Sequence, residues 1–442
     1  MRDQKHIAWL YEQLPGLVSE GTLTSEAAQR LRERYGEAEG GRGVQSATLF
    51  GVLGAVLVGG GIILLLAHNW DDFSRTTRAA LSFAPLVLAQ ALAGYALWRK
   101  PESVAWREGA GAFLTLAIGA SIALVAQTYN IAGDVGDFLL TWSLLALPIV
   151  YVTPAIVPAL LYLIGVTVWA SAQWTSNAEA LGYFVLVALI LPWWLFEAKD
   201  NPYRPRPVIF AWAFALLLPY GLTASLHDAF DLQGVWMLLS GAIAGALFLA
   251  GRRFWGEGIS RMQQPLQTLG ALAAVVLALV FSFEDIWRMQ MRDLTGDAGA
   301  FRHALSADPI AFAIAALWLL LWLALWIDSL RFRDWARSLL GALPIFVALG
   351  LVLTRFDYPL AAMLLLNAYL FALGLGTLLA GLGEQSLGRV NGGMLILAAV
   401  ILVRFFDADI GFIARGLAFI ALGASFLIVN LVMIRRRGAA EP

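Results

Sequence analysis

The sequence predicts an all-α protein: a polytopic transmembrane helix bundle of about fourteen spans with a small cytoplasmic helical hairpin at its N-terminus. Of its 442 residues, 60% are hydrophobic and only 14% are charged, and the mean hydropathy is +0.73. Soluble globular proteins have about 45–50% apolar and about 25% charged residues. The composition therefore excludes a water-soluble fold and makes the lipid bilayer the first expected partner.

Charge and cysteine content exclude further classes of protein. The formal net charge is -1, so we expect no nucleic-acid partner, which would favour a strongly basic chain. The chain has no cysteine, which excludes disulfides, thiolate catalysis and cysteine-ligated metals. It has no phosphate-binding loop, dinucleotide fingerprint, nucleophile elbow or haem motif, and its four histidines lack metal-ligand spacing. We therefore expect no cofactor and no metal.

The chain is expected to have three parts: a cytoplasmic head at residues 1–45, a transmembrane bundle at 46–434 and a basic cytoplasmic tail at 435–442. The head mixes acids and bases and has no apolar run long enough to span. Gly21 interrupts its helical periodicity, and Thr24 or Ser25 is a suitable N-cap for a second helix. Glycines at 36, 40, 41 and 43 then predict a flexible joint.

Apolar runs of about 20 residues, long enough to cross a membrane, recur from Ser46 onward. We place spans at 46–68, 78–98, 108–130, 137–152, 154–171, 180–197, 207–226, 233–251, 266–283, 309–327, 337–354, 358–380, 388–404 and 411–434. Prolines 148, 154 and 158 leave two interpretations of residues 137–171, either two crossings or one re-entrant segment.

The distribution of basic residues predicts the orientation. With the head inside, alternate loops and the tail hold sixteen lysines and arginines, whereas the opposite loops hold eight. Short cytoplasmic loops collect basic residues. We therefore expect a multi-pass protein of the bacterial inner membrane with both termini in the cytoplasm.

Two motifs in the first half of the chain resemble a known family. They are His68-Asn69-Trp70-Asp71-Asp72-Phe73-Ser74-Arg75, after a glycine-rich span, and Ala126-Gln127-Thr128-Tyr129-Asn130-Ile131-Ala132-Gly133-Asp134, leading to Trp142 and Pro148. Roughly residues 5 to 160 resemble the DUF2157 family of predicted bacterial membrane proteins. The resemblance implies an uncharacterised function and carries over no catalytic residues.

The first candidate ligand site lies at the outer end of the first helix pair. Its residues are Trp70, Asp71, Asp72, Arg75 and Arg78. Spacings of four and seven residues would return both arginines to the face of Asp71 if all of them shared one helix. A solvated interfacial turn, with Trp70 as an aromatic anchor, is the alternative interpretation.

The second candidate site lies at the outer end of the third expected span. Its residues are Gln127, Tyr129, Asn130, Asp134 and Asp137. Gly133 and Gly136 would permit a tight turn there, and the carboxylates would coordinate a cation or bind the hydroxyl groups of a small-molecule, sugar or lipid ligand. Polar residues at the end of a span also occur without any ligand.

Polar residues within the spans have two interpretations. Gln90, Asn367, Asn391 and Asn430 either bond across packed helices or line a translocation path. Gly241 and Gly245 form a small-residue motif that favours close helix packing.

Three functions remain open. The number of spans, the recurring helix hairpins and the lack of catalytic loops favour a transporter or flippase-like protein with an outward-facing polar site. The alternative is a non-transporting membrane subunit or sensor that docks a protein partner through residues 1–45. A membrane-embedded glycosyltransferase using Asp71 and Asp72 is less favoured because the loop is short, so a non-enzyme is expected.

The orientation gives the first testable prediction. A reporter that is active only outside the cytoplasm, fused after Pro442, should remain inactive because the basic residues place that end inside. The same reporter fused after residue 131 should be active. Activity at Pro442 would overturn the even number of spans.

Overall fold

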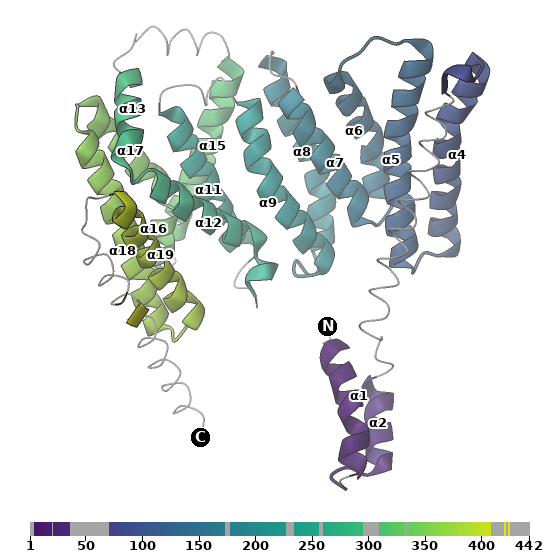
Figure 1. Ribbon diagram of the computed structural model, residues 1–442, viewed down its shortest axis with the longest axis horizontal. Helices are drawn as coiled ribbons and strands as arrows, with labels where there is room; N and C mark the ends of the chain where they lie inside the picture. Colours follow the sequence, from purple (N-terminus) through teal and green to yellow (C-terminus); the bar gives the residue numbers. More distant parts are fainter. Residues whose placement is uncertain are drawn as a thin grey trace. The chain divides into compact units, whose positions relative to one another are not determined.

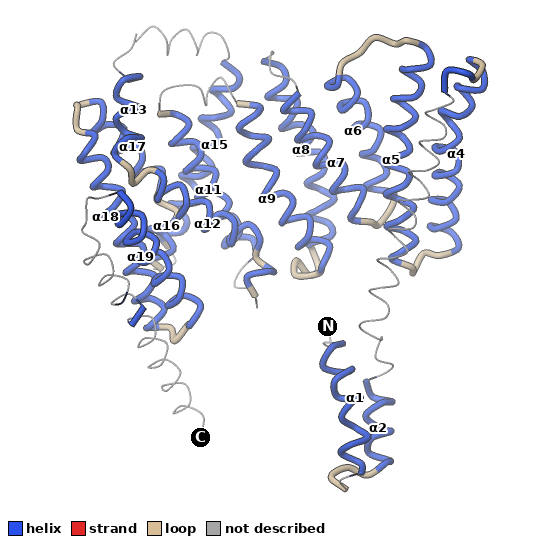
Figure 2. Tube along the Cα trace, viewed as in Figure 1, coloured by secondary structure: helices blue, strands red, loops and turns tan. Residues whose placement is uncertain are grey.

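The computed structural model describes residues 4–19, 21–35, 70–172, 177–226, 234–255, 260–294, 309–331, 334–407, 420 and 423–424. Every secondary-structure element within these ranges is a helix (Figure 2). The expected all-α class is therefore confirmed. The chain divides into two compact units, residues 1–81 and 82–442.

The first unit begins with the helical hairpin that the sequence predicts. Its helices are α1 (Gln4–Ser19) and α2 (Ser25–Tyr35). Leu14 of α1 and Ala28 of α2 are buried. Gly21 has a φ of +74°, a left-handed conformation that glycine adopts without steric cost. Thr24 accepts a hydrogen bond from the amide of Ala27 at 3.2 Å and so caps the start of α2.

Nine helices in the described residues are long and apolar enough to cross a membrane. They are α4 (Arg75–Arg99), α5 (Val104–Tyr129), α6 (Val135–Val152), α8 (Asn177–Ala198), α9 (Pro205–Ser225), α11 (Val235–Trp255), α15 (Pro309–Leu330), α18 (Pro359–Gly383) and α19 (Leu387–Asp407). The chain is therefore a multi-pass membrane protein. Figure 1 shows α18 beside α19 at one end of the second unit.

Shorter helices complete the described part of the second unit. They are α7 (Ile156–Ala172), α12 (Pro265–Val280), α13 (Glu284–Leu294), α16 (Trp335–Leu340) and α17 (Leu343–Arg355). Helices α12 and α13 meet at an angle of 79° and together have the length of one bent span. The expected span at 46–68, and all of 411–434 except residues 420 and 423–424, lie outside the described residues, so the count of fourteen stays a prediction.

The structure corrects the single span expected at 337–354. That segment is two helices, α16 and α17, separated at Gly341 and Ala342. Asp334 caps α16 by accepting a hydrogen bond from the amide of Arg337 at 3.2 Å. Pro344 lies at the start of α17, where its missing N–H is tolerated. The hydropathy of the segment is continuous, but these local signals divide it.

Residues 137–171, which the sequence left open, form two helices that pack side by side. Helices α6 and α7 are joined at Thr153–Ala155. The Thr153 hydroxyl donates to the carbonyl of Ile149 at the end of α6. The amides of Ile156 and Val157, which begin α7, are bound by a side chain of α5, Glu108.

Helix α11 is the element that joins the two largest apolar cores. Leu239, Ile243 and Leu247 pack into the core around α7, α8 and α9, whereas other residues of α11 pack against α12 and α17 in the second core. The expected close packing at Gly241 and Gly245 is confirmed for Gly245. A methyl group added there would lie 2.8 Å from the indole nitrogen of Trp322.

Adjacent glycines of α19 provide a test of this packing. A Cβ at Gly393 would lie 2.4 Å from the backbone nitrogen of Leu378 in α18, whereas a Cβ at Gly392 would meet nothing within 4 Å. Gly393→Ala should destabilise the protein by about 1–3 kcal/mol because backbone must move. Gly392→Ala is the matched control. Equal melting temperatures for the two variants in detergent would contradict the packing of α18 against α19.

Candidate functional site

The first predicted cluster occupies a short turn and the start of α4. Trp70, Asp71 and Asp72 form the 3-10 helix η1 (Trp70–Asp72), and Arg75 and Arg78 lie in the first turn of α4. Asp72 is exposed and Trp70 is buried. The side chain of Asp71 lies outside what the structure describes.

The expected helical alignment of Asp71 with the two arginines is wrong. Helix α4 begins only at Arg75, and Ser74 accepts a hydrogen bond from the Thr77 amide at 3.2 Å, which marks Ser74 as the N-cap. Asp71 therefore lies in a separate element. The Arg78 Nε donates to the Phe73 carbonyl at 3.0 Å and ties α4 to the preceding turn.

The second predicted cluster is brought together on the link between α5 and α6. Gln127 and Tyr129 are exposed in the last turn of α5, and Asp137 is exposed in the first turn of α6. Asn130 ends α5 with a φ of 52°, and its N–H donates to the Ala126 carbonyl.

Local structure accounts for part of this cluster. The Asp134 carboxylate accepts a hydrogen bond from the Asp137 amide at 2.8 Å and caps α6. The left-handed residue of the link is Asn130, since neither Gly133 nor Gly136 has a positive φ. Asn130 and Asp134 thus have structural roles, and ligand binding by the exposed carboxylates of this link stays a prediction.

The first cluster lies in residues 1–81 and the second in residues 82–442. Their meeting in one site stays a prediction. Within the described residues, no group of three or more metal-ligating side chains occurs.

The structure reveals a polar site that the sequence did not assemble, at the break between α12 and α13. Arg404 of α19 donates to the backbone carbonyl of Ser282 and, at 2.9 Å, to its hydroxyl. Asn367 of α18 donates to the same carbonyl at 3.2 Å. The Trp287 indole donates at 2.7 Å to the carbonyl of Phe281. Three side chains therefore satisfy the carbonyls that the bend frees from the helix.

The surroundings of Arg404 are mostly apolar. Its guanidinium lies 5.1 Å from the centre of the Phe283 ring and 3.8 Å from the sulfur of Met363. Two side-chain acceptors are buried and have no hydrogen-bond partner among the described residues. They are Oδ1 of Asn367 on α18 and Oε1 of Gln290 on α13. The break thus combines a partly buried cation with the unpaired amide oxygen of Asn367, and that of Gln290 lies further along α13.

Sequence reasoning separated these residues. Asn367 is one of several polar residues within the expected spans, and Arg404, at the end of the expected span 388–404, is one of the eight basic residues that the sequence places in the outer loops. The available signal was the acidic pair Glu284 and Asp285 directly after an apolar run. Acids in a first turn indicate the start of a new helix.

Comparison with known proteins confirms the family resemblance. Residues 15–159 match the family described as "Predicted membrane protein (DUF2157)". No curated protein and no solved structure matches the chain. Both clusters predicted from the sequence lie inside the matched segment, whereas the α12–α13 break lies beyond it.

Asp134 gives a prediction that separates capping from ligand binding. Asp134→Ala should lower stability by about 0.5–2 kcal/mol because it removes the N-cap, and Asp134→Asn should retain most of that stability. Gln127→Ala, on the same exposed link, is the control and should not change the melting temperature in detergent. If Asp134→Ala melts like the wild type, the cap does not stabilise α6.

Proposed function

We propose that this multi-pass membrane protein with a DUF2157 segment is a transporter whose outward-facing polar site is built around the α12–α13 break. The main support is that Arg404 binds the carbonyl and hydroxyl of Ser282 at a 79° bend in a membrane helix. Residence in a bacterial inner membrane with both termini in the cytoplasm is part of this proposal.

A broken helix within a bundle favours transport for a physical reason. The bilayer core supplies no hydrogen bonds, so non-helical backbone is tolerated only where protein or a water-filled cavity satisfies it. Transporters place substrates and coupling ions at such breaks. An ionisable residue inside a bundle is costly to keep and marks a functional site by default.

The chemistry of Arg404 favours an anionic substrate. Its guanidinium presents five N–H donors in a planar fork that matches carboxylate and phosphate oxygens. An arriving anion would compete with the Ser282 carbonyl for those donors. Binding would therefore be coupled to the geometry of the break, which is what a transport cycle requires.

Ion pairs at the opposite helix ends support an outward-facing arrangement. Glu108 of α5 binds the first amides of α7 at 2.8 and 3.0 Å and pairs with Arg206 of α9 at 3.7 Å. Arg206 also lies 3.9 Å from Glu197 of α8. These partly buried charges tie four helices together at the end that the charge distribution places in the cytoplasm. Their separation would open that side.

The proposal also includes the loop residues that the sequence predicts as ligand-binding. The expected topology puts Asp72 on the outer side of the membrane, and it puts the α5–α6 link with Asp134 on that side too. Each is proposed as a polar ligand site of its own. Partner docking through residues 1–45 remains a second proposal, favoured by the separate helical hairpin of α1 and α2.

Reconstitution of the full chain tests the transport proposal. Proteoliposomes should give substrate-induced currents with at least one of inorganic phosphate, sulfate, acetate or succinate, and none with choline. Arg404→Ala should weaken the apparent affinity more than tenfold, because a hydrogen bond to a charged group contributes about 1.5–3 kcal/mol. A fluorescent phospholipid in the same vesicles measures flippase activity.

The matched control is Arg288→Ala. Arg288 lies on α13 and forms an exposed pair with Glu284 at 2.7 Å, so its loss should leave currents unchanged. Asn367→Ala provides a second variant at the break if Arg404→Ala does not fold. Wild-type vesicles that give neither current nor lipid movement would contradict the proposal, as would full activity in both break variants.

A further inference from the structure

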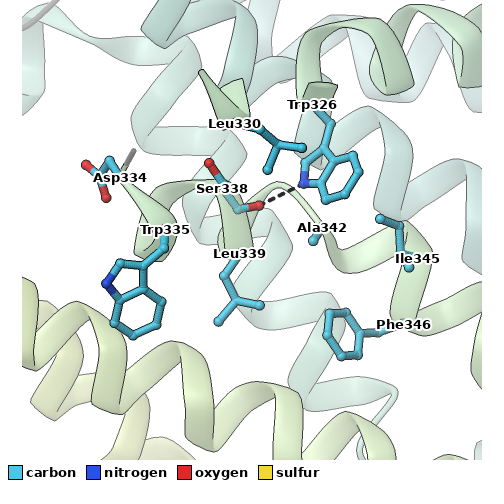
Figure 3. A pocket seen from close by; sticks show the side chains of 9 residues that line it. All are labelled: Trp326, Leu330, Asp334, Trp335, Ser338, Leu339, Ala342, Ile345 and Phe346. Carbon is cyan, nitrogen blue, oxygen red and sulfur yellow. Dashed lines mark hydrogen bonds between the residues drawn. The ribbon is translucent and has the colours of Figure 1, made fainter. Parts of the chain in front are cut away.

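An apolar groove lies where α15 faces the break between α16 and α17 (Figure 3). Its volume is about 490 Å³, within the range of about 300–1,000 Å³ that small-molecule sites occupy. It is lined by Trp326, Leu330, Asp334, Trp335, Ser338, Leu339, Ala342, Ile345 and Phe346. Of these residues, Asp334 and Ser338 carry side-chain oxygens and the others are apolar or aromatic.

The groove follows from the break itself. Helix α17 has 13 residues, or about 20 Å of helix, whereas the hydrocarbon core is about 30 Å thick. The backbone carbonyls at the break already have hydrogen-bond donors within the protein, so they do not need a ligand in the groove. Trp326 donates to the Ser338 carbonyl at 2.9 Å, Trp322 donates to the Gly341 carbonyl at 2.9 Å, and Tyr369 donates to the Leu339 carbonyl. The remaining space is apolar, and apolar space at membrane depth suits a hydrocarbon chain.

Arginines gather at the end of the groove that holds Asp334. The Asp334 carboxylate pairs with Arg337 at 2.8 Å and with Arg389 at 3.3 Å, and Arg389 also binds Glu384. At the adjoining helix ends, Asp328 lies 3.5 Å from both Arg253 and Arg331. Arg261 of η2 (Arg261–Gln263) donates to the Gly388 carbonyl at 2.7 Å.

These contacts leave positive charge in excess. Arg337 and Arg389 are balanced by two carboxylates, those of Asp334 and Glu384. The excess lies at the end of α15, where Arg253 and Arg331 share the single carboxylate of Asp328 and both arginines are exposed. Arginine recognises phosphate through paired hydrogen bonds. Trp335, which lines the groove, is 56% exposed, and tryptophan is enriched at the depth of lipid headgroups.

We propose that this groove binds one phospholipid of the leaflet that faces the arginine-rich ends. One acyl chain lies along Leu330, Leu339 and Phe346, and the phosphate binds beside Leu330, at Arg331 and Arg253. The occupant is a lipid because exposed basic charge follows directly after the groove residue Leu330, and an apolar groove beside such charge is complementary to a phosphate on a hydrocarbon chain. This site is separate from the α12–α13 break and does not depend on the proposed transport function.

Photolabelling of the reconstituted full chain tests the site. A phospholipid with a diazirine on its acyl chain should label residues 326–346 more strongly than other lipid-exposed segments. Leu339→Trp, which fills the groove, should lower that labelling about tenfold because the chain loses its apolar contacts. Leu320→Trp is the matched control, since Leu320 is exposed on α15 and does not line the groove.

Two further results decide the proposal. Unlabelled phosphatidylglycerol and phosphatidylethanolamine should compete with the probe, and the stronger competitor identifies the headgroup, whereas free inorganic phosphate should not compete. Arg331→Gln should weaken that competition while leaving the acyl chain position unchanged. Uniform labelling of all lipid-facing helices in the wild type would mean bulk lipid only and would overturn the site, even if Leu339→Trp fails to fold.

Discussion

At three helix breaks in the described part of the chain, side chains bind the backbone groups that the break frees. Water cannot do so in the hydrocarbon core, and each unsatisfied group would cost several kcal/mol. Arg404, Asn367 and Trp287 serve the break after α12. Tryptophans of α15 and Tyr369 serve the break between α16 and α17. Glu108 binds the amides that begin α7. The positions of these residues fix how the helices pack around them.

Close helix packing makes this arrangement possible. Small residues on α11 let Trp322 approach the backbone near Gly245, so that its indole also reaches the Gly341 carbonyl. Gly350 of α17 similarly lies against Trp287, where an added methyl group would lie 2.5 Å from the ring. In both cases a large side chain that satisfies a break occupies the space a glycine leaves. Packing and hydrogen bonding are therefore coupled, and a change in one is expected to affect the other.

The same breaks are the places where function is proposed. At the α12–α13 break the satisfying group is charged, so a competing anion can exchange with the Ser282 carbonyl. At the α16–α17 break the satisfying groups are neutral indoles and a phenol, and the consequence is an apolar hollow beside a basic rim. The difference in side-chain chemistry distinguishes a proposed substrate site from a proposed lipid site within one architecture.

The sequence by itself determined the all-α membrane class, the helical hairpin with Gly21 and Thr24, and most span positions, because apolar length and capping signals are local. It also located the α5–α6 link, although it assigned the turn to glycines and not to Asn130. Only the tertiary structure decided that 337–354 is broken, that Asp71 does not share a helix with Arg75, and that Arg404 meets Ser282. Arg404 and Ser282 are more than a hundred residues apart, and their contact depends on how α18 and α19 pack against α12, which no local pattern encodes.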